Sequence, residues 1–253
     1  MLRIIITILF LALGSTVLAA QDVPFGAPTG EVPHLRVELH WGRIIIATHD
    51  QPFARIAAEG QSNVDGLRSL NEPRLAIDTA AGRISVAQPE PERGNFRSAE
   101  ITVLVPERCH LELVMLRGGD IEVRDVTGEI SVTNRNGSVA LHDVAGAAMV
   151  NASNGSIAAS FRAVDPESDL QFITLNGSVE LCLPEDFAAR LALYTEGDPI
   201  LSRFEVAPAA FPAASVPAVE SAGGETVLGQ VGDSERWLVA STLNGEIRLE
   251  RCP

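Results

Sequence analysis

The sequence contains no lysine, so all 19 of its basic residues are arginines, against 33 aspartate and glutamate residues. Without an amine side chain, Schiff-base chemistry, a Walker-type phosphate loop and a lysine general base are excluded. The formal net charge is −14, and the arginines do not cluster into the basic face that binds phosphate backbones. Nucleic acid is therefore not an expected partner.

Long hydrophobic runs are also missing after the first residues, so no transmembrane segment is expected in the mature chain. Residues 1–19 place Arg3 before a short apolar stretch and end with Val17 and Ala19 at the positions that signal peptidase reads. This pattern predicts a secretory signal peptide that is cleaved after Ala19. Residues 20–33 are interpreted as a linker. We therefore expect secretion across the inner membrane, to the periplasm or the cell surface.

A repeat of glycine, any residue, apolar, any residue, apolar organises what is present. Five copies follow one another at a spacing of nine residues, and four more occur elsewhere in the chain. The alternation predicts half-buried strands. The glycines predict corners at which the backbone needs a positive φ. The predicted structural corners include Gly119, Gly128, Gly137, Gly146, Gly155, Gly177 and Gly245.

Two kinds of corner, Asp-Val-x-Gly and Asn-Gly, alternate and create a longer period of 18 residues. The pattern fits antiparallel hairpins that turn at each Asn-Gly, or a β-solenoid whose coils stack on one another. A hairpin would set Ile130 opposite Asp143, whereas 18-residue coils align Val123, Leu141 and Ala159 in one interior column. The predicted fold is therefore an all-β solenoid. The next interior column would hold Ile121, Val139 and Ile157.

One segment, residues 205–224, breaks the repeat with several prolines and many alanines. The repeat resumes at Trp237, so we interpret the segment as a loop inserted into one solenoid domain that covers residues 34–253. A spacer is its expected role, and a docking segment is the alternative.

The cysteines are few: Cys109, Cys182 and Cys252. An odd number in an oxidising compartment allows at most one intramolecular bridge, and no two have CxxC-type spacing. Because Cys182 and Cys252 both fall on the outward side of their strands, we expect these two to be bridged. An internal duplication places Cys109 where Phe187 stands, which predicts a buried core residue. No metal or other cofactor is expected.

The quoted motifs resemble a known family. A secreted chain that opens with LRVELHWGRIIIATHD, repeats GDIEV, GEISV and NGSVEL, and closes with STLNGEIRLER is similar to the bacterial DUF4097 family, often labelled adhesins and related to the toastrack domains. The resemblance covers about residues 34–253. It implies a right-handed, single-stranded β-helix at the cell envelope, sometimes linked to envelope stress systems. It brings no catalytic residues, and the Ala/Pro insertion departs from its compact pattern.

Carboxylates on one outward face are the candidates for chemistry, since some parallel β-helices cleave polysaccharides with a general acid and a base. Asp120 and Glu122 share such a face, but later coils carry serine and alanine at the same positions. We therefore expect no catalysis. The alternative is a polysaccharide lyase or hydrolase that uses Asp120 and Glu122.

The expected function is a binding or scaffolding module, adhesin-like, in the envelope of a bacterium. Its partner would be an envelope protein or glycan. A glycan-stacking patch of Trp41, Tyr194 and Trp237 is an alternative, although such dispersed aromatics are more often core or cap residues. A second alternative is self-assembly, in which the end coils of neighbouring molecules stack. The expected binding face consists of Ser138, Ala140, Ser156 and Ala158.

Overall fold

A computed structural model describes residues 20–26, 31–64, 67–69, 75–80, 82–89, 97–212, 216–217 and 224–252. The predicted signal peptide, residues 1–19, lies outside these residues. Throughout the described ranges all regular structure is β-strand. The strands are β1 (Gln21–Pro24), β2 (His34–His49), β3 (Phe53–Val64), β4 (Leu67–Ser69), β5 (Ala76–Ala80), β6 (Arg83–Ala87), β7 (Arg97–Pro106), β8 (His110–Arg124), β9 (Thr127–Asn136), β10 (Val139–Asn154), β11 (Ile157–Val164), β12 (Leu170–Ile173), β13 (Val179–Leu183), β14 (Ala189–Thr195), β15 (Ile200–Ser202), β16 (Ala207–Pro208), β17 (Glu225–Val231), β18 (Trp237–Thr242) and β19 (Ile247–Arg251).

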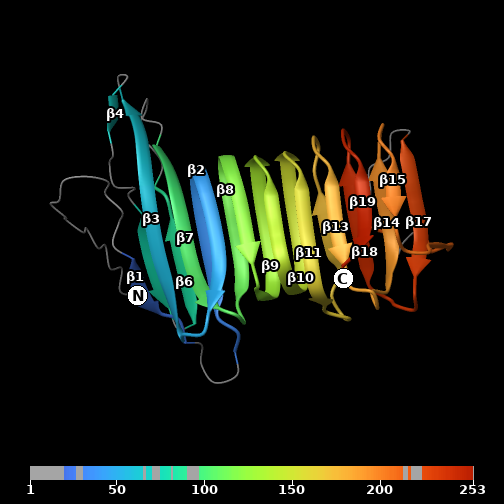
Figure 1. Cartoon of the computed structure of the whole chain (residues 1–253), viewed down its shortest axis with the longest axis horizontal. Coiled ribbons are helices and arrows are strands. Elements are labelled where there is room, and N and C mark those ends of the chain that lie inside the picture. Colours follow the sequence, from blue (N-terminus) through green and yellow to red (C-terminus); the bar gives the residue numbers. More distant parts are fainter. Residues whose placement is uncertain are drawn as a thin grey trace.

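The strands stand side by side along the long axis of the molecule (Figure 1). Long strands such as β8 and β10 turn a corner and contribute to both sides of the coil, so all the strands belong to one continuous sheet. The first wall contains β11, β13 and β19. It also contains the second halves of β2 and β8, which follow Gly42 and Gly119, and the first half of β10. The second wall contains β9, β12, β18 and β14 with the other halves. The apolar side chains between the two walls form the core.

Parallel pairing in the central coils confirms the solenoid. In the first wall, Ile121 pairs with Val139 and Val139 with Ile157, and the next column likewise joins Val123, Leu141 and Ala159. These six side chains are all at least 96% buried. The hairpin alternative is wrong here, because residues 18 apart are neighbours on parallel strands.

The 18-residue coil does not hold along the whole stack. Ile157 pairs with Val179, and Val179 pairs with Ile247, so the chain inserts four extra residues in one step and a long excursion in the next. The excursion is not a plain loop, because its residues form β14 to β17 and continue both walls. Parallel stacking constrains only the residues that face the core and corners, so extra chain is tolerated between them.

The order of strands in space differs from their order in the chain. Figure 1 shows β2 between β7 and β8, and β19 between β13 and β15. Beyond these inserted coils, both ends are covered by antiparallel strands: β3 lies on β7, β5 on β6 and β17 on β14. Antiparallel cover of this kind pairs backbone groups that an abrupt end would leave open.

Two segments interpreted as irregular from the sequence contain ordered strand. In the expected linker, residues 21–24 form β1, which pairs with β3, because Val23 and Phe25 are buried in the core. In the expected inserted loop, β16 pairs with β17. Phe211 of the same loop packs against Trp237, with ring centroids 4.8 Å apart. The linker interpretation is therefore corrected at residues 21–24, and the inserted segment contains ordered chain at residues 207–208, while its role as a spacer stays a prediction.

Candidate functional site

A ladder of glycines forms the corner between the walls. At Gly137 φ is +127°, and a Cβ built there would lie 2.2 Å from the carbonyl oxygen of Gly119 in the neighbouring coil. A side chain is therefore excluded both by backbone conformation and by the close approach of the coils. The other predicted corner glycines also have positive φ and a backbone oxygen within 2.4 Å of such a Cβ: Gly119, Gly128, Gly146, Gly155, Gly177 and Gly245.

An asparagine ladder runs beside the glycines and was not expected from the sequence. The side-chain amide of Asn154 donates to Oδ1 of Asn136 at 2.8 Å. In the next coils, Asn176 donates to Asn154 and Asn244 donates to Asn176, each at 2.7 Å. From the sequence, the Asn-Gly pairs predict only turns. Because Asn154 and Asn176 each donate to one neighbouring coil and accept from the other, the asparagines also fix the register of neighbouring coils.

Buried polar side chains satisfy the corner carbonyls from inside. The hydroxyl of Thr174 donates to the oxygen of Gly155 at 2.9 Å, and the hydroxyl of Thr242 donates to that of Gly177 at 2.8 Å. Both threonines are at least 99% buried. Donation from the core compensates for burying these hydroxyls and holds the corner from its inner side.

The predicted binding face lies on the outer surface of the first wall. Ala140 of β10 pairs with Ala158 of β11, and the amide of Ser178 in the next coil donates to the hydroxyl of Ser156 at 3.2 Å. Ser138, Ser156 and Ala158 are exposed and Ala140 is half-buried. The structure therefore brings the four residues together as a patch of short side chains on a parallel, in-register backbone.

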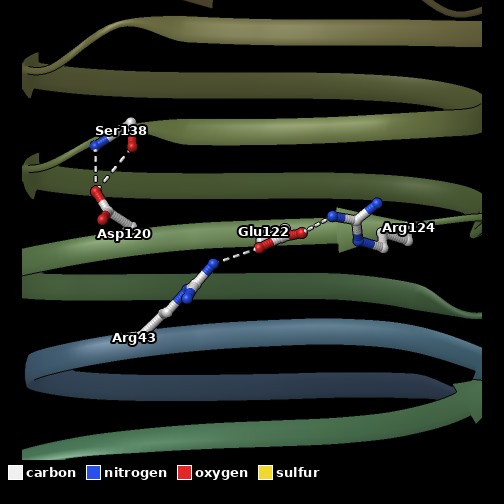
Figure 2. Close-up of polar contacts among 5 residues, drawn as sticks. All are labelled: Arg43, Asp120, Glu122, Arg124 and Ser138. Atoms are coloured by element: carbon white, nitrogen blue, oxygen red, sulfur yellow. Dashed lines mark hydrogen bonds and ion pairs between the residues drawn. The ribbon is translucent and has the colours of Figure 1, made fainter.

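Charged residues border this patch on the side of β8. Figure 2 shows Glu122 between two arginines: Arg43 lies 2.7 Å away, and Arg124 makes a second ion pair. Burial acts to raise the pKa of Glu122, but the hydrogen bonds from Arg124 and Arg43 outweigh it and hold that pKa below its ordinary value. A general acid needs a raised pKa, so Glu122 has the opposite tuning.

Asp120 caps the neighbouring coil rather than facing open solvent alone. Its Oδ1 accepts hydrogen bonds from both the amide and the hydroxyl of Ser138, each at 2.8 Å (Figure 2). Asp120 and Glu122 do project from the same face, as the sequence predicted, but each is engaged by a different set of donors. The geometry favours roles in joining coils.

The cysteines follow the expected division. Cys182 and Cys252 are joined by a disulfide, with Cα atoms 5.1 Å apart. Cys182 lies in β13 and Cys252 directly follows β19, and these two strands are parallel neighbours. Cys109 is fully buried, and burial raises the pKa of its thiol to about 12. It therefore stays protonated at ordinary pH and behaves as a small core residue.

The three aromatic residues do not form a glycan-stacking patch. Tyr194 is fully buried, and Trp237 is 7% exposed and packs against Phe211. Trp41 lies in β2, far from the other two along the stack, and its ring lies against Gly118 of the neighbouring strand β8. Tyr194 and Trp237 are therefore buried residues, whereas Trp41 is half-buried.

Within the described residues, no group of three or more histidine, cysteine, aspartate or glutamate side chains is arranged to hold a metal ion. A search of the same residues finds no helix with the length and apolar character that crossing a membrane requires.

Comparison with known proteins gives one distant likeness. No protein-family model matches the chain, and no curated protein matches it. A crystal structure from Clostridium sporogenes, described as that of a "putative cell adhesion protein", is similar with a TM-score of 0.48 and 12% sequence identity, over 92% of this chain and 100% of the other. At that identity and TM-score the likeness does not establish a shared activity or partner.

Proposed function

We propose that this protein is a secreted binding or scaffolding module of the bacterial envelope, with an adhesin-like role and no catalytic activity. The observation that carries the proposal is the outer face of the first wall, where Ser138, Ala140, Ser156 and Ala158 lie in register on a continuous parallel sheet. Short side chains on a rigid backbone let a partner approach the sheet closely at little entropic cost.

The rigidity of this face has a physical basis in the corner ladders. Glycine contacts, asparagine amides and buried threonine hydroxyls fix the spacing between neighbouring coils. A face that is ordered before binding loses little freedom when a partner arrives. The charge of −14 favours a partner that is neutral or basic where it meets the protein.

The enzyme alternative is less well supported by the geometry. Both members of the candidate pair are engaged in coil-joining contacts, and the pKa of Glu122 is lowered. A lyase or hydrolase that uses Asp120 and Glu122 would release products from a polysaccharide panel and lose that activity in Asp120→Asn. Product release with that dependence would replace the binding proposal.

Self-assembly is the second alternative, and the antiparallel cover at both ends bears on it. With β3, β5 and β17 in place, backbone groups of the end coils are already paired on one side. Light scattering at high concentration separates the two ideas, because a monomer has no stacked ends.

The proposal is tested by replacing Ala140 and Ala158 together with arginine and measuring co-sedimentation of the mature protein with isolated envelopes. Two long charged side chains at the centre of the patch should reduce capture at least about tenfold, since they block close approach. The matched control replaces Thr133 and Asn151, a register pair on the second wall, in the same way. Equal capture by both variants, each with an unchanged circular dichroism spectrum, would reject this face.

A further inference from the structure

The C-terminal excursion contributes most of the lining of a hollow on the surface. It has a volume of about 700 Å³ and lies where four segments meet: the turn before β14, the segment from β15 to β16, the end of β17 and the end of β19. This volume is within the range of pockets that hold small molecules or a few side chains of a peptide. None of the four residues of the proposed binding face lines it.

Two phenylalanines form the floor of the hollow. Phe187 is 4% exposed and Phe204 is 6% exposed, and their rings meet edge to face with centroids 5.8 Å apart. Each ring carries a guanidinium of the protein itself: Arg236 lies over Phe187 and Arg251 over Phe204, both at 5.0 Å from the centroid. The floor is therefore a surface on which a guanidinium is already seated.

The two arginines differ in how firmly they are held. The guanidinium of Arg236 donates to the backbone oxygens of Ala188 and Asp165 at 2.7 Å each, so it is part of the frame. Arg251 is an exposed residue at the end of β19, and it lines the hollow directly. Arg251 thus occupies the place over Phe204 that an external cation would take.

The rim is acidic and spread out. Glu185, Asp186, Glu205 and Asp233 line the hollow, all on exposed residues, and Arg251 is the only basic residue of the lining. These carboxylates do not converge as metal ligands do, since the described residues contain no cluster of three or more potential ligands. Separated carboxylates around an aromatic floor suit an extended ligand with several positive charges better than a single ion.

We propose that this hollow binds a basic peptide segment of a partner protein. An arginine or lysine of the segment displaces Arg251 from the face of Phe204, and neighbouring basic residues pair with the carboxylates of the rim. The net charge of −14 draws such a segment toward the protein. The hollow and the small-residue face are formed by different segments, so binding at one can be tested without changing the other.

The rim is tested by fluorescence anisotropy with a labelled Gly-Arg-Ala-Arg-Gly peptide and the mature, disulfide-bonded protein. Replacing Glu185 with glutamine and Asp186 with asparagine should weaken binding about tenfold, because two charge-assisted contacts are lost. The matched control, Glu100→Gln with Glu129→Gln, removes the same charge from exposed residues elsewhere and should change binding less than about twofold. Equal weakening by both variants would mean diffuse attraction and would overturn the proposal.

Arg251→Ala supplies a test of opposite sign. Removing the internal cation uncovers Phe204 and takes the one positive charge out of the lining, so the peptide should bind about threefold more tightly. If Arg251 only supported the fold, the substitution would weaken binding or leave it unchanged, which contradicts the proposal.

Stoichiometric calcium that displaces the peptide would identify a metal site instead. The Ala140 and Ala158 variant should bind the peptide normally.

Discussion

The central coils and the C-terminal coils are built on the same corner but differ in how much chain they carry between corners. From residue 119 to residue 160 each coil repeats after 18 residues, and the outward positions of the first wall include short side chains, at Ala140 and Ala158, and Asp120, which is engaged with the neighbouring coil. Beyond Val179 the chain makes a long excursion before Ile247 completes the next step. The regular part presents a flat face, whereas the excursion encloses the hollow between its added segments. Strict periodicity gives a uniform surface, and departures from the period allow concave sites.

The largest expected effect on stability is at a corner of the regular coils. Gly137→Ala would place a Cβ 2.2 Å from the oxygen of Gly119 on a backbone with positive φ, so we expect a loss of about 4 kcal/mol in the free energy of unfolding. The matched control is Gly197→Ala in the excursion, where a Cβ has no atom within 4 Å. It should cost less than about 0.5 kcal/mol.

Denaturant unfolding followed by circular dichroism measures both glycine variants. A small effect at Gly137 would show that neighbouring coils can separate, and the ladder would then not be what fixes their spacing. A large effect at Gly197 would mean that the excursion is as constrained as the coils, which removes the contrast between them.

The architecture of the central coils could be predicted because the residues that face inward repeat. Ile121, Val139 and Ile157 had to share a column once the period was 18, whichever way each side chain packed in detail. The corner glycines followed in the same way from their spacing. Periodicity carries this information because every coil meets the same steric demand.

The positions of β2 and of β18 and β19 could not be predicted from the repeat. All copies of the repeat present similar apolar residues to the core, so the pattern does not say which copies become neighbours. The pairing of Ile44 with both Ile101 and Ile121 depends instead on how the connecting chain closes. The asparagine ladder was missed for a related reason, since Asn-Gly is also a sufficient signal for a turn.

The candidate sites were predictable to different degrees. The small-residue face follows from alternation and the coil length, so Ser138 and Ser156 could be assigned to one surface. The hollow has no periodic signal, because Phe187, Phe204 and Asp233 come from separate parts of the excursion. The sequence duplication aligned Phe187 with Cys109 and predicted only that Cys109 is buried, which the structure confirms.

The disulfide ties the excursion to the regular stack, so removing it should sharpen the contrast between the two regions. Cys182 and Cys252 enclose a separation of 70 residues, and replacing both with alanine should cost about 3 kcal/mol, because the unfolded chain regains the freedom of that loop. Hydrogen exchange should then rise in β14 to β17 more than in β9 to β11. Uniform exchange along the stack would contradict a local role.

Thiol counting checks the covalent state in the same preparation. The native protein should show no reactive thiol, since Cys109 is buried and its pKa is raised to about 12. Denaturation without reductant should expose one thiol, and reduction should expose all three. Three thiols before reduction would mean that Cys182 and Cys252 are not bridged in the isolated protein.

The smallest expected effect is the pH dependence of the ion pairs beside the flat face. The pKa of Glu122 is lowered in the folded protein, so its contribution to stability is present above the unfolded value of about 4.3 and is lost as the pH falls through the lower folded value. Because Arg43 and Arg124 are about half exposed, at 46% and 51%, the contribution at pH 7 should stay below about 1 kcal/mol. Glu122→Gln should therefore lower the melting temperature slightly at pH 7 and leave it unchanged near pH 2, where the wild-type carboxyl is also protonated.

Arg203→Gln, which removes an ion pair with Glu250 in the C-terminal coils, serves as the comparison, because its arginine is 73% exposed and should contribute still less. A larger effect from Arg203 than from Glu122 would show that charge pairs stabilise the C-terminal coils more than the regular ones, the reverse of the order that their exposure predicts.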